Sequence, residues 1–159
     1  MSLVVYRDVP VEDRQQFLTC MVSVIRADGL LDASEIATLH EVLLAWDLGV
    51  AELERLHRSL REGPEVSVQS LPGFVHPKTA YILVRTLIRL SHEDGSYCEE
   101  EQALVQQYAK RYLVPPQRVA ALEAFVQAEV SMARAGDALL EPVIQSAESG
   151  IHWQAAADA

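Results

Sequence analysis

The fold is decided by two stretches of sequence that lie 66 positions apart: residues 25–35 read IRADGLLDASE, and residues 91–101 read SHEDGSYCEEE. Each stretch contains Asp-Gly, followed after five residues by a glutamate. Glycine adopts the left-handed conformation that commonly follows the C-terminus of a helix, and an acidic residue favours the first turn of a helix. Each stretch therefore predicts a corner at which one helix ends and the next begins.

Helical periodicity extends outward from both corners. Before the first corner, apolar residues recur at helical spacing from about Val11 to Ala27. Six further helices are expected: from near Asp32, after Gly49, from Pro77, from about Cys98 to Leu113, from Pro115-Pro116, and after a capping Asp137.

The segment between Gly63 and His76 has no steady period and contains several glycines and prolines, which predicts a long surface loop. The segment after Pro77 is apolar nearly all round, which is typical of a central helix. Its β-branched residues leave a strand as the alternative. A helix is favoured because Arg85 and Arg89 lie four positions apart and no hairpin signal follows.

The two halves of the sequence match beyond the corners. Each half has the same order of apolar helix, Asp-Gly, acidic helix start, helix, turn and apolar helix, which is the pattern of an internal repeat. At an offset of 66, the apolar pairs are Trp46 with Tyr112, Leu53 with Val119, Leu56 with Leu122, and Leu60 with Val126.

We therefore expect a single all-α domain over residues 1–159, with about seven helices and a tail at 150–159. Its helical repeats cover about 17–62 and 81–130 and pack around an approximate two-fold axis. Such an axis places the two corners where they can face one another.

The charge of the chain bears on its partners. The chain has 159 residues, with 13 Lys and Arg against 23 Asp and Glu, for a formal net charge of -10. This charge is repelled by nucleic acids and by anionic lipid. The sequence has no apolar run long enough to span a membrane, and its first residues lack the layout of a signal peptide. A cytoplasmic location is therefore expected. Cys20 and Cys98 show no metal or redox spacing.

The corners predict a cation site. Asp28 and Glu35 can converge on the first corner, with Asp32 nearby, and Asp94 and Glu101 can converge on the second. Carboxylates gathered at one point repel, and a hard divalent cation relieves the repulsion. Oxygen ligands suit Ca²⁺, Mg²⁺ or Mn²⁺.

The alternative is that these acidic residues only cap helices. Asp32-Ala33-Ser34-Glu35 has the capping-box pattern, in which the first residue and the glutamate satisfy each other's backbone amides. Because the corner occurs in both halves, a cation site and simple helix capping explain the acidic residues about equally well. The corners do not match an EF-hand, because the loop is too short and lacks the alternating ligands.

The two quoted stretches resemble the paired motifs of the TerB-like family, named for tellurite-resistance protein B. The resemblance covers about Phe17 to Val130. It implies an all-helical fold and an acidic cluster that binds divalent metal, in bacterial stress-response or tellurite-resistance systems. By position, the family's acidic residues correspond to Asp28, Glu35, Asp94 and Glu101. The sequence departs from the family pattern at Glu93, where a small residue is usual, and at Cys98, which stands where the first half has Asp32.

No motif for catalysis is present, so a non-enzymatic function is expected. The first hypothesis is a cytoplasmic, cation-binding TerB-like module, with protein partners in a stress-response complex. The second is a metal-free protein-interaction scaffold whose acidic corners are caps or a docking patch. A third is a hydrolase that uses the paired carboxylates with a metal. His92, beside the second corner, is interpreted as an ordinary helix-end histidine.

Overall fold

The chain is helical throughout the part described by the computed structural model, which comprises residues 4–27, 33–64, 66–93 and 97–148. These ranges contain seven α-helices, one short 3-10 turn and no strand, which confirms the all-α prediction. The elements are α1 (Val4–Arg7), α2 (Val11–Ala27), α3 (Ala33–Ala45), α4 (Val50–Glu62), η1 (Val68–Ser70), α5 (Pro77–Glu93), α6 (Glu99–Arg111) and α7 (Pro116–Glu148).

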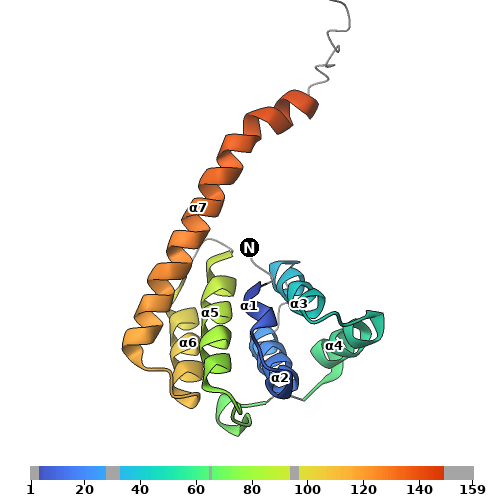
Figure 1. Ribbon diagram of the computed structural model, residues 1–159, viewed down its shortest axis with the longest axis vertical. Helices are drawn as coiled ribbons and strands as arrows, with labels where there is room; N and C mark the ends of the chain where they lie inside the picture. Colours follow the sequence, from blue (N-terminus) through green and yellow to red (C-terminus); the bar gives the residue numbers. More distant parts are fainter. Residues whose placement is uncertain (1–3, 28–32, 65, 94–96, 149–159) are drawn as a thin grey trace, which may run out of the picture.

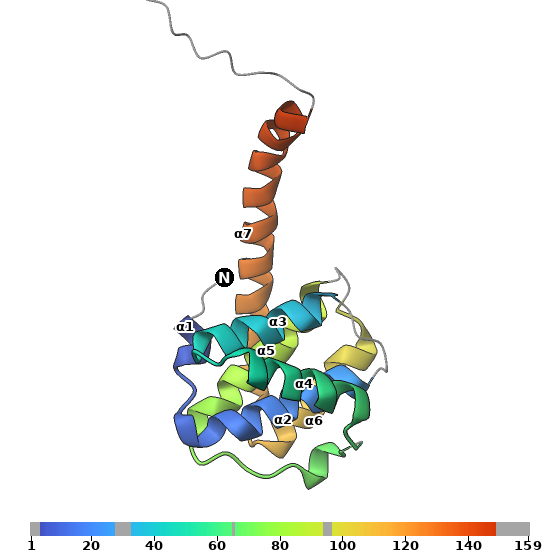
Figure 2. The same cartoon turned by 90° about the vertical axis from the view of Figure 1, so that its right-hand side faces the viewer.

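The helices α1 to α6 form a body, and α7 lies along it before projecting away (Figures 1 and 2). At the centre of the body, α5 contacts α2, α3, α6 and α7. Its residues Leu83, Val84, Leu87 and Ile88 are buried. This confirms the prediction of a central helix at this position, because a helix that is apolar nearly all round needs neighbours on every side.

An aromatic chain fixes the N-terminal part of the core. The rings of Tyr6 and Phe17 meet edge to face at 6.3 Å between centroids, and those of Phe17 and Trp46 do so at 5.8 Å. The indole nitrogen of Trp46 donates a hydrogen bond of 2.6 Å to the carbonyl oxygen of Tyr6. The short helix α1, which the sequence patterns did not predict, is held to α3 by these contacts.

The helices of the two halves start at a constant spacing. Helices α2 and α5 each have 17 residues, α3 and α6 each have 13, and the first residues within each pair lie 66 positions apart. Helices α4 and α7 also begin 66 positions apart. The left-handed residues that follow α3 and α6 are Asp47 (φ 53°) and Leu113 (φ 59°), again 66 apart.

Both left-handed residues close a helix in the same way. After α3, the amide of Leu48 bonds to the carbonyl of Leu43, and after α6 the amide of Val114 bonds to that of Ala109. Such bonds satisfy carbonyl groups that the last turn of a helix leaves without donors.

The C-terminal part of the chain differs from expectation. The prediction that Asp137 caps a separate last helix is wrong, because α7 continues without a break from Pro116 to Glu148. The segment is rich in alanine, and one interior glycine, Gly136, costs only about 1 kcal/mol of helix stability. The last turns of α7 change direction (Figure 1). Pro142, which lacks an amide donor, lies six residues before the end of α7 at Glu148. The expected tail at 150–159 lies outside the described residues.

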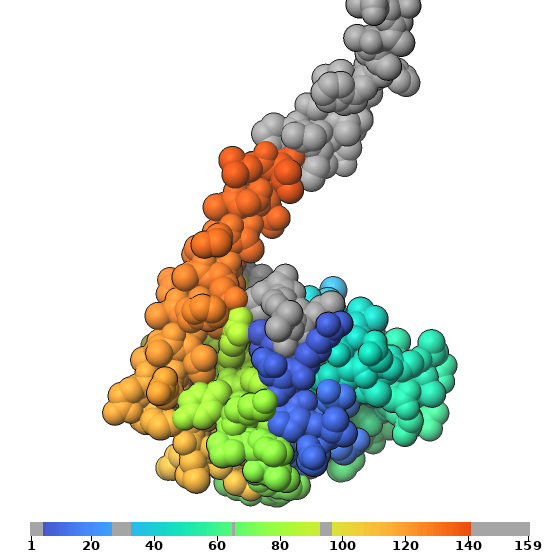
Figure 3. Space-filling view, in the orientation of Figure 1, coloured from blue at the N-terminus to red at the C-terminus, as the bar shows by residue number. Residues whose placement is uncertain are grey.

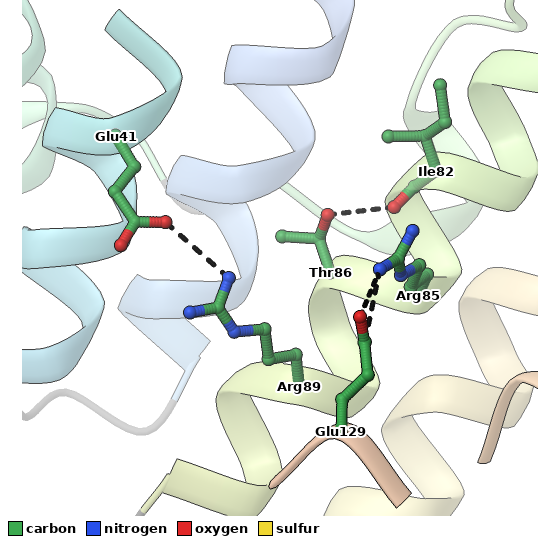
Figure 4. Close-up of polar contacts among 6 residues, drawn as sticks. All are labelled: Glu41, Ile82, Arg85, Thr86, Arg89 and Glu129. Carbon is green, nitrogen blue, oxygen red and sulfur yellow. Dashed lines mark hydrogen bonds and ion pairs between the residues drawn. The ribbon is translucent and has the colours of Figure 1, made fainter. Parts of the chain in front are cut away.

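Two arginines of α5 bind the flanking helices (Figure 4). Arg85 donates to both carboxylate oxygens of Glu129 on α7, at 2.8 and 3.0 Å. Arg89 reaches Glu41 on α3 at 3.5 Å. Both arginines are mostly shielded from solvent, and at each a neighbouring helix supplies the opposite charge.

A buried carboxylate joins the two halves. Asp13 of α2 is 1% exposed and accepts three hydrogen bonds: from the amide of Val75 (2.7 Å), the amide of His76 (3.0 Å) and the hydroxyl of Thr79 (2.6 Å). The last two donors belong to the start of α5. Asp13 therefore holds the start of α5 and the end of the loop that precedes it from a distant helix.

We predict that Asp13→Ala lowers the free energy of unfolding by about 3 kcal/mol, because one buried donor and two part-buried donors lose their acceptor. Thr79→Val removes one of the three bonds and should cost about 1 kcal/mol. Urea unfolding of both variants measures the difference. A loss below about 0.5 kcal/mol in Asp13→Ala would show that the carboxylate does not hold α5 in place.

The same group predicts a pH dependence. Burial raises the pKa of Asp13, but the hydrogen bonds from Thr79, Val75 and His76 outweigh it, and the net pKa lies below its ordinary value. The stabilisation is therefore complete above the unfolded-state pKa of about 4 and is lost as the pH falls through the lower folded-state pKa. Between about pH 5 and pH 2.5, wild type should lose more stability than Asp13→Asn. Parallel slopes in acid urea titrations would contradict this.

Candidate functional site

The predicted cation site lies where the helices turn. The first corner joins α2 to α3 and the second joins α5 to α6. In Figure 2, the ends of α2 and α5 and the starts of α3 and α6 lie towards one edge of the body. Of the five predicted ligands, Asp28, Asp32 and Asp94 lie outside the described residues.

The two described ligands occupy matching places. Glu35 is the third residue of α3, Glu101 is the third residue of α6, and both are half-buried. The Oε2 atom of Glu101 accepts a hydrogen bond of 2.8 Å from the amide of Cys98. This is the backbone contact of a capping box, so Glu101 stabilises the start of α6 whether or not a cation binds.

Aromatic groups line the second corner. The rings of His92 and Tyr97 lie 4.7 Å apart between centroids. The hydroxyl of Tyr97 donates a hydrogen bond of 2.7 Å to Glu123 on α7. Burial raises the pKa of Tyr97, and its bond to the Glu123 carboxylate raises it further, so the phenol stays protonated. Tyr97 is thus a hydrogen-bond donor that anchors the start of α6 to α7.

Within residues 4–27, 33–64, 66–93 and 97–148, no three His, Cys, Asp or Glu side chains are grouped so that they could hold a metal ion. Because most of the predicted ligands lie outside these ranges, the composition of the site stays a prediction.

A groove that the sequence did not indicate opens elsewhere on the body. It has a volume of about 900 Å³ and lies between α2, α4, α6 and residues 63–69. Polar side chains such as Arg26 and Gln107 share its lining with apolar ones. Its main apolar residues are Leu18, Val22, Leu56, Val68 and Leu104.

The loop that borders the groove is fixed by close backbone contacts. A Cβ atom at Gly63 would lie 2.6 Å from the carbonyl oxygen of Ser59, so only glycine fits there. Arg26 of α2 donates to the carbonyl of Pro64 (2.8 Å), and Ser23 donates to that of Val66 (3.1 Å). The glycine-proline pair at 63–64 was the only sequence signal near this feature, and it indicates a turn rather than a cavity.

The cysteines do not form a reactive centre. Cys20 is fully buried, and burial raises the pKa of its thiol to about 11. Its sulfur lies 3.0 Å from the hydroxyl of Tyr112. A protonated, buried thiol is a poor nucleophile. Cys98 is exposed at the start of α6.

Comparisons with family models, with curated proteins and with solved structures gave no match. The resemblance to the TerB-like family therefore depends on the two motifs and their spacing. Among the helices that the structure describes, none is long and apolar enough to cross a lipid bilayer.

We predict that Glu101→Ala lowers the free energy of unfolding by about 1 kcal/mol, because the amide of Cys98 loses its acceptor. Glu101→Gln keeps an acceptor oxygen in the same place, so its free energy of unfolding should stay within a few tenths of a kcal/mol of the wild-type value. Thermal and urea unfolding in EDTA measure the cap alone. Equal losses in the two variants would contradict the capping role.

Proposed function

We propose that the chain is a non-enzymatic TerB-like helical module, built from two pseudo-symmetric halves, that binds a divalent cation at its two acidic corners. It acts by binding, in the cytoplasm, within a stress-response or tellurite-resistance system. The constant spacing of 66 positions between equivalent helices supports the duplication. So does the hydrogen bond from Thr79 to Asp13, because these residues occupy equivalent positions 66 apart and a two-fold axis between the halves would bring such positions together.

The observation that carries the cation proposal is the matching position of Glu35 and Glu101. Each is the third residue of its helix, directly after a corner that contains Asp-Gly. A cation site shared between the halves requires this correspondence. Ca²⁺, Mg²⁺ and Mn²⁺ accept mixed carboxylate and water ligands, and the positive charge would offset the repulsion between the acidic groups.

The second candidate is a metal-free protein-interaction scaffold. The hydrogen bond from the amide of Cys98 to Glu101 favours this candidate, because the carboxylate already caps the start of α6. The groove between α2, α4 and α6 supplies a surface, since its mixed apolar and polar lining suits a short amphipathic helix of a partner protein. If this second candidate is correct, the protein binds a partner protein and does not bind cations.

We predict that millimolar Ca²⁺, Mg²⁺ or Mn²⁺ raises the melting temperature of wild type relative to EDTA. At a free cation concentration 100 times the dissociation constant, binding to the folded state alone contributes about 2.7 kcal/mol. For a chain of this size this corresponds to about 5–10 °C. The double variant Asp28→Asn/Asp94→Asn should show no shift. Differential scanning calorimetry with elemental analysis of the purified protein measures both.

Glu101→Gln is the matched control, because it removes one charge from the corner but preserves the cap. It should reduce the cation shift without lowering the melting temperature in EDTA. The opposite result is that no cation shifts the melting temperature of wild type, and that Asp32→Ala lowers the free energy of unfolding by about 1 kcal/mol both in EDTA and with cation present. The corners are then helix caps, and the metal-free scaffold is the correct function.

A further inference from the structure

The C-terminal half of α7 stands apart from the body. The first half is anchored, with Val119 and Val126 fully buried and Glu129 paired with Arg85. From Ser131 to Leu140 every side chain is exposed. Figure 3 shows this part of the helix, in orange to red, rising clear of the other helices. Arg134 donates a hydrogen bond of 3.3 Å to the carbonyl oxygen of His92 on α5, but the apolar side chains of the segment are exposed. A helix with little tertiary packing is only marginally stable in water, so we expect this segment to bind a partner.

A regular apolar stripe runs from the anchored half of α7, where the ring of Phe125 lies 4.9 Å from the guanidinium of Arg85, into the exposed half. Phe125, Met132 and Leu139 follow at intervals of seven and are 52%, 76% and 79% exposed. Ala128 and Ala135, each three residues after a large member, complete the pattern. Apolar residues at the first and fourth positions of successive heptads form the seam of a coiled coil. The stripe is therefore the contact face of a helix pair.

The stripe is also free of charge. Its flanking positions in the exposed half are Ser131, Gly136 and Ala138. The charged residues between 131 and 140 are Arg134 and Asp137, and at 100° per residue both lie about 140–160° round the helix from the middle of the stripe. Two chains that each carry a net charge of -10 repel unless their contact avoids acidic groups. The exposed half of the stripe meets that condition, and beside Ala128 the carboxylate of Glu129 is already paired with Arg85.

We propose that the stripe pairs two copies of this chain through antiparallel α7 helices. With the two-fold axis between residues 133 and 134, Met132 packs on Ala135 of the second copy and Leu139 packs on Ala128. Each layer then joins one large and one small side chain, which lets the helices approach evenly. In a parallel pair, layers of two large residues alternate with layers of two alanines, and the alanine layers stay unfilled. The contact is isologous and closes as a dimer.

The size of the stripe places the pair among weak, reversible interfaces. At about 150–200 Å² for a fully exposed large apolar side chain, Phe125, Met132 and Leu139 bring about 350 Å² per copy. With the alanines and flanking surface, the pair buries about 1,000 Å² in total, the lower limit for a specific interface. We therefore expect a reversible dimer with a dissociation constant of about 10–100 μM.

Sedimentation equilibrium of the full chain from about 1 to 300 μM tests the proposal. Wild type should convert from monomer to dimer, and Met132→Lys should weaken the dimer at least tenfold. Gln127→Lys is the matched control, because it adds the same charge to an exposed position of α7 about 140° from Met132. It should leave the dimer unchanged. A monomeric wild type at the highest concentration, or equal effects of the two variants, would overturn the proposal.

Cysteine crosslinking tests the orientation, in a Cys98→Ser background that removes the exposed native thiol. A mixture of Ala128→Cys and Leu139→Cys chains should form the mixed disulfide in preference to either homodimer. Preferential crosslinking of Ala128→Cys with itself would show a parallel pair and overturn the antiparallel arrangement.

Discussion

The fold depends on the burial of α5. A helix that is apolar on nearly all sides has no face to present to water, so it must be enclosed by α2, α3, α6 and α7. Its two arginines pair with Glu129 of α7 and Glu41 of α3, which supply the opposite charge. The enclosure fixes where α7 leaves the body, and thereby the direction of its exposed half.

The second constraint is the buried carboxylate of Asp13, which joins α2 to the start of α5. Each of its three donors comes from residues 75–79, more than 60 positions away. A buried carboxylate is tolerated only when hydrogen bonds compensate for lost hydration, so the loop before α5 has little freedom in how it approaches the body. The same contact brings equivalent positions of the two halves together, which is the geometry on which the proposed corner site relies.

Local patterns were sufficient to predict most of the fold. Apolar periodicity identified α2 to α6, and the continuous apolar character of residues 81–88 predicted the central helix, because burial follows directly from where apolar residues fall along a helix. The expected break at Asp137 was wrong, since capping residues also occur inside helices when alanine-rich neighbours favour continuation. Helix α1 was missed because four residues are too short for any period, and its position depends on Trp46 and Phe17.

Among the candidate sites too, those with a local sequence pattern could be predicted and those formed by residues distant in sequence could not. Glu101 was predicted from its place after Asp-Gly, and its contact with Cys98 follows from the local geometry of a capping box. The groove has no local signature, because its lining comes from three helices and a loop that are distant in sequence. Asp13 has none either, since an aspartate in the first turn of a helix usually faces water.

The central claim is that the duplicated corners form one cation site. Diffraction from crystals grown with Mn²⁺, recorded to locate the metal by its anomalous scattering, tests it most directly. The account predicts one peak, with oxygen ligands from both residues 28–35 and residues 94–101 at about 2.2 Å. Two separated corners without metal, with Glu35 and Glu101 each bonded only to the amides of its own helix, would contradict it.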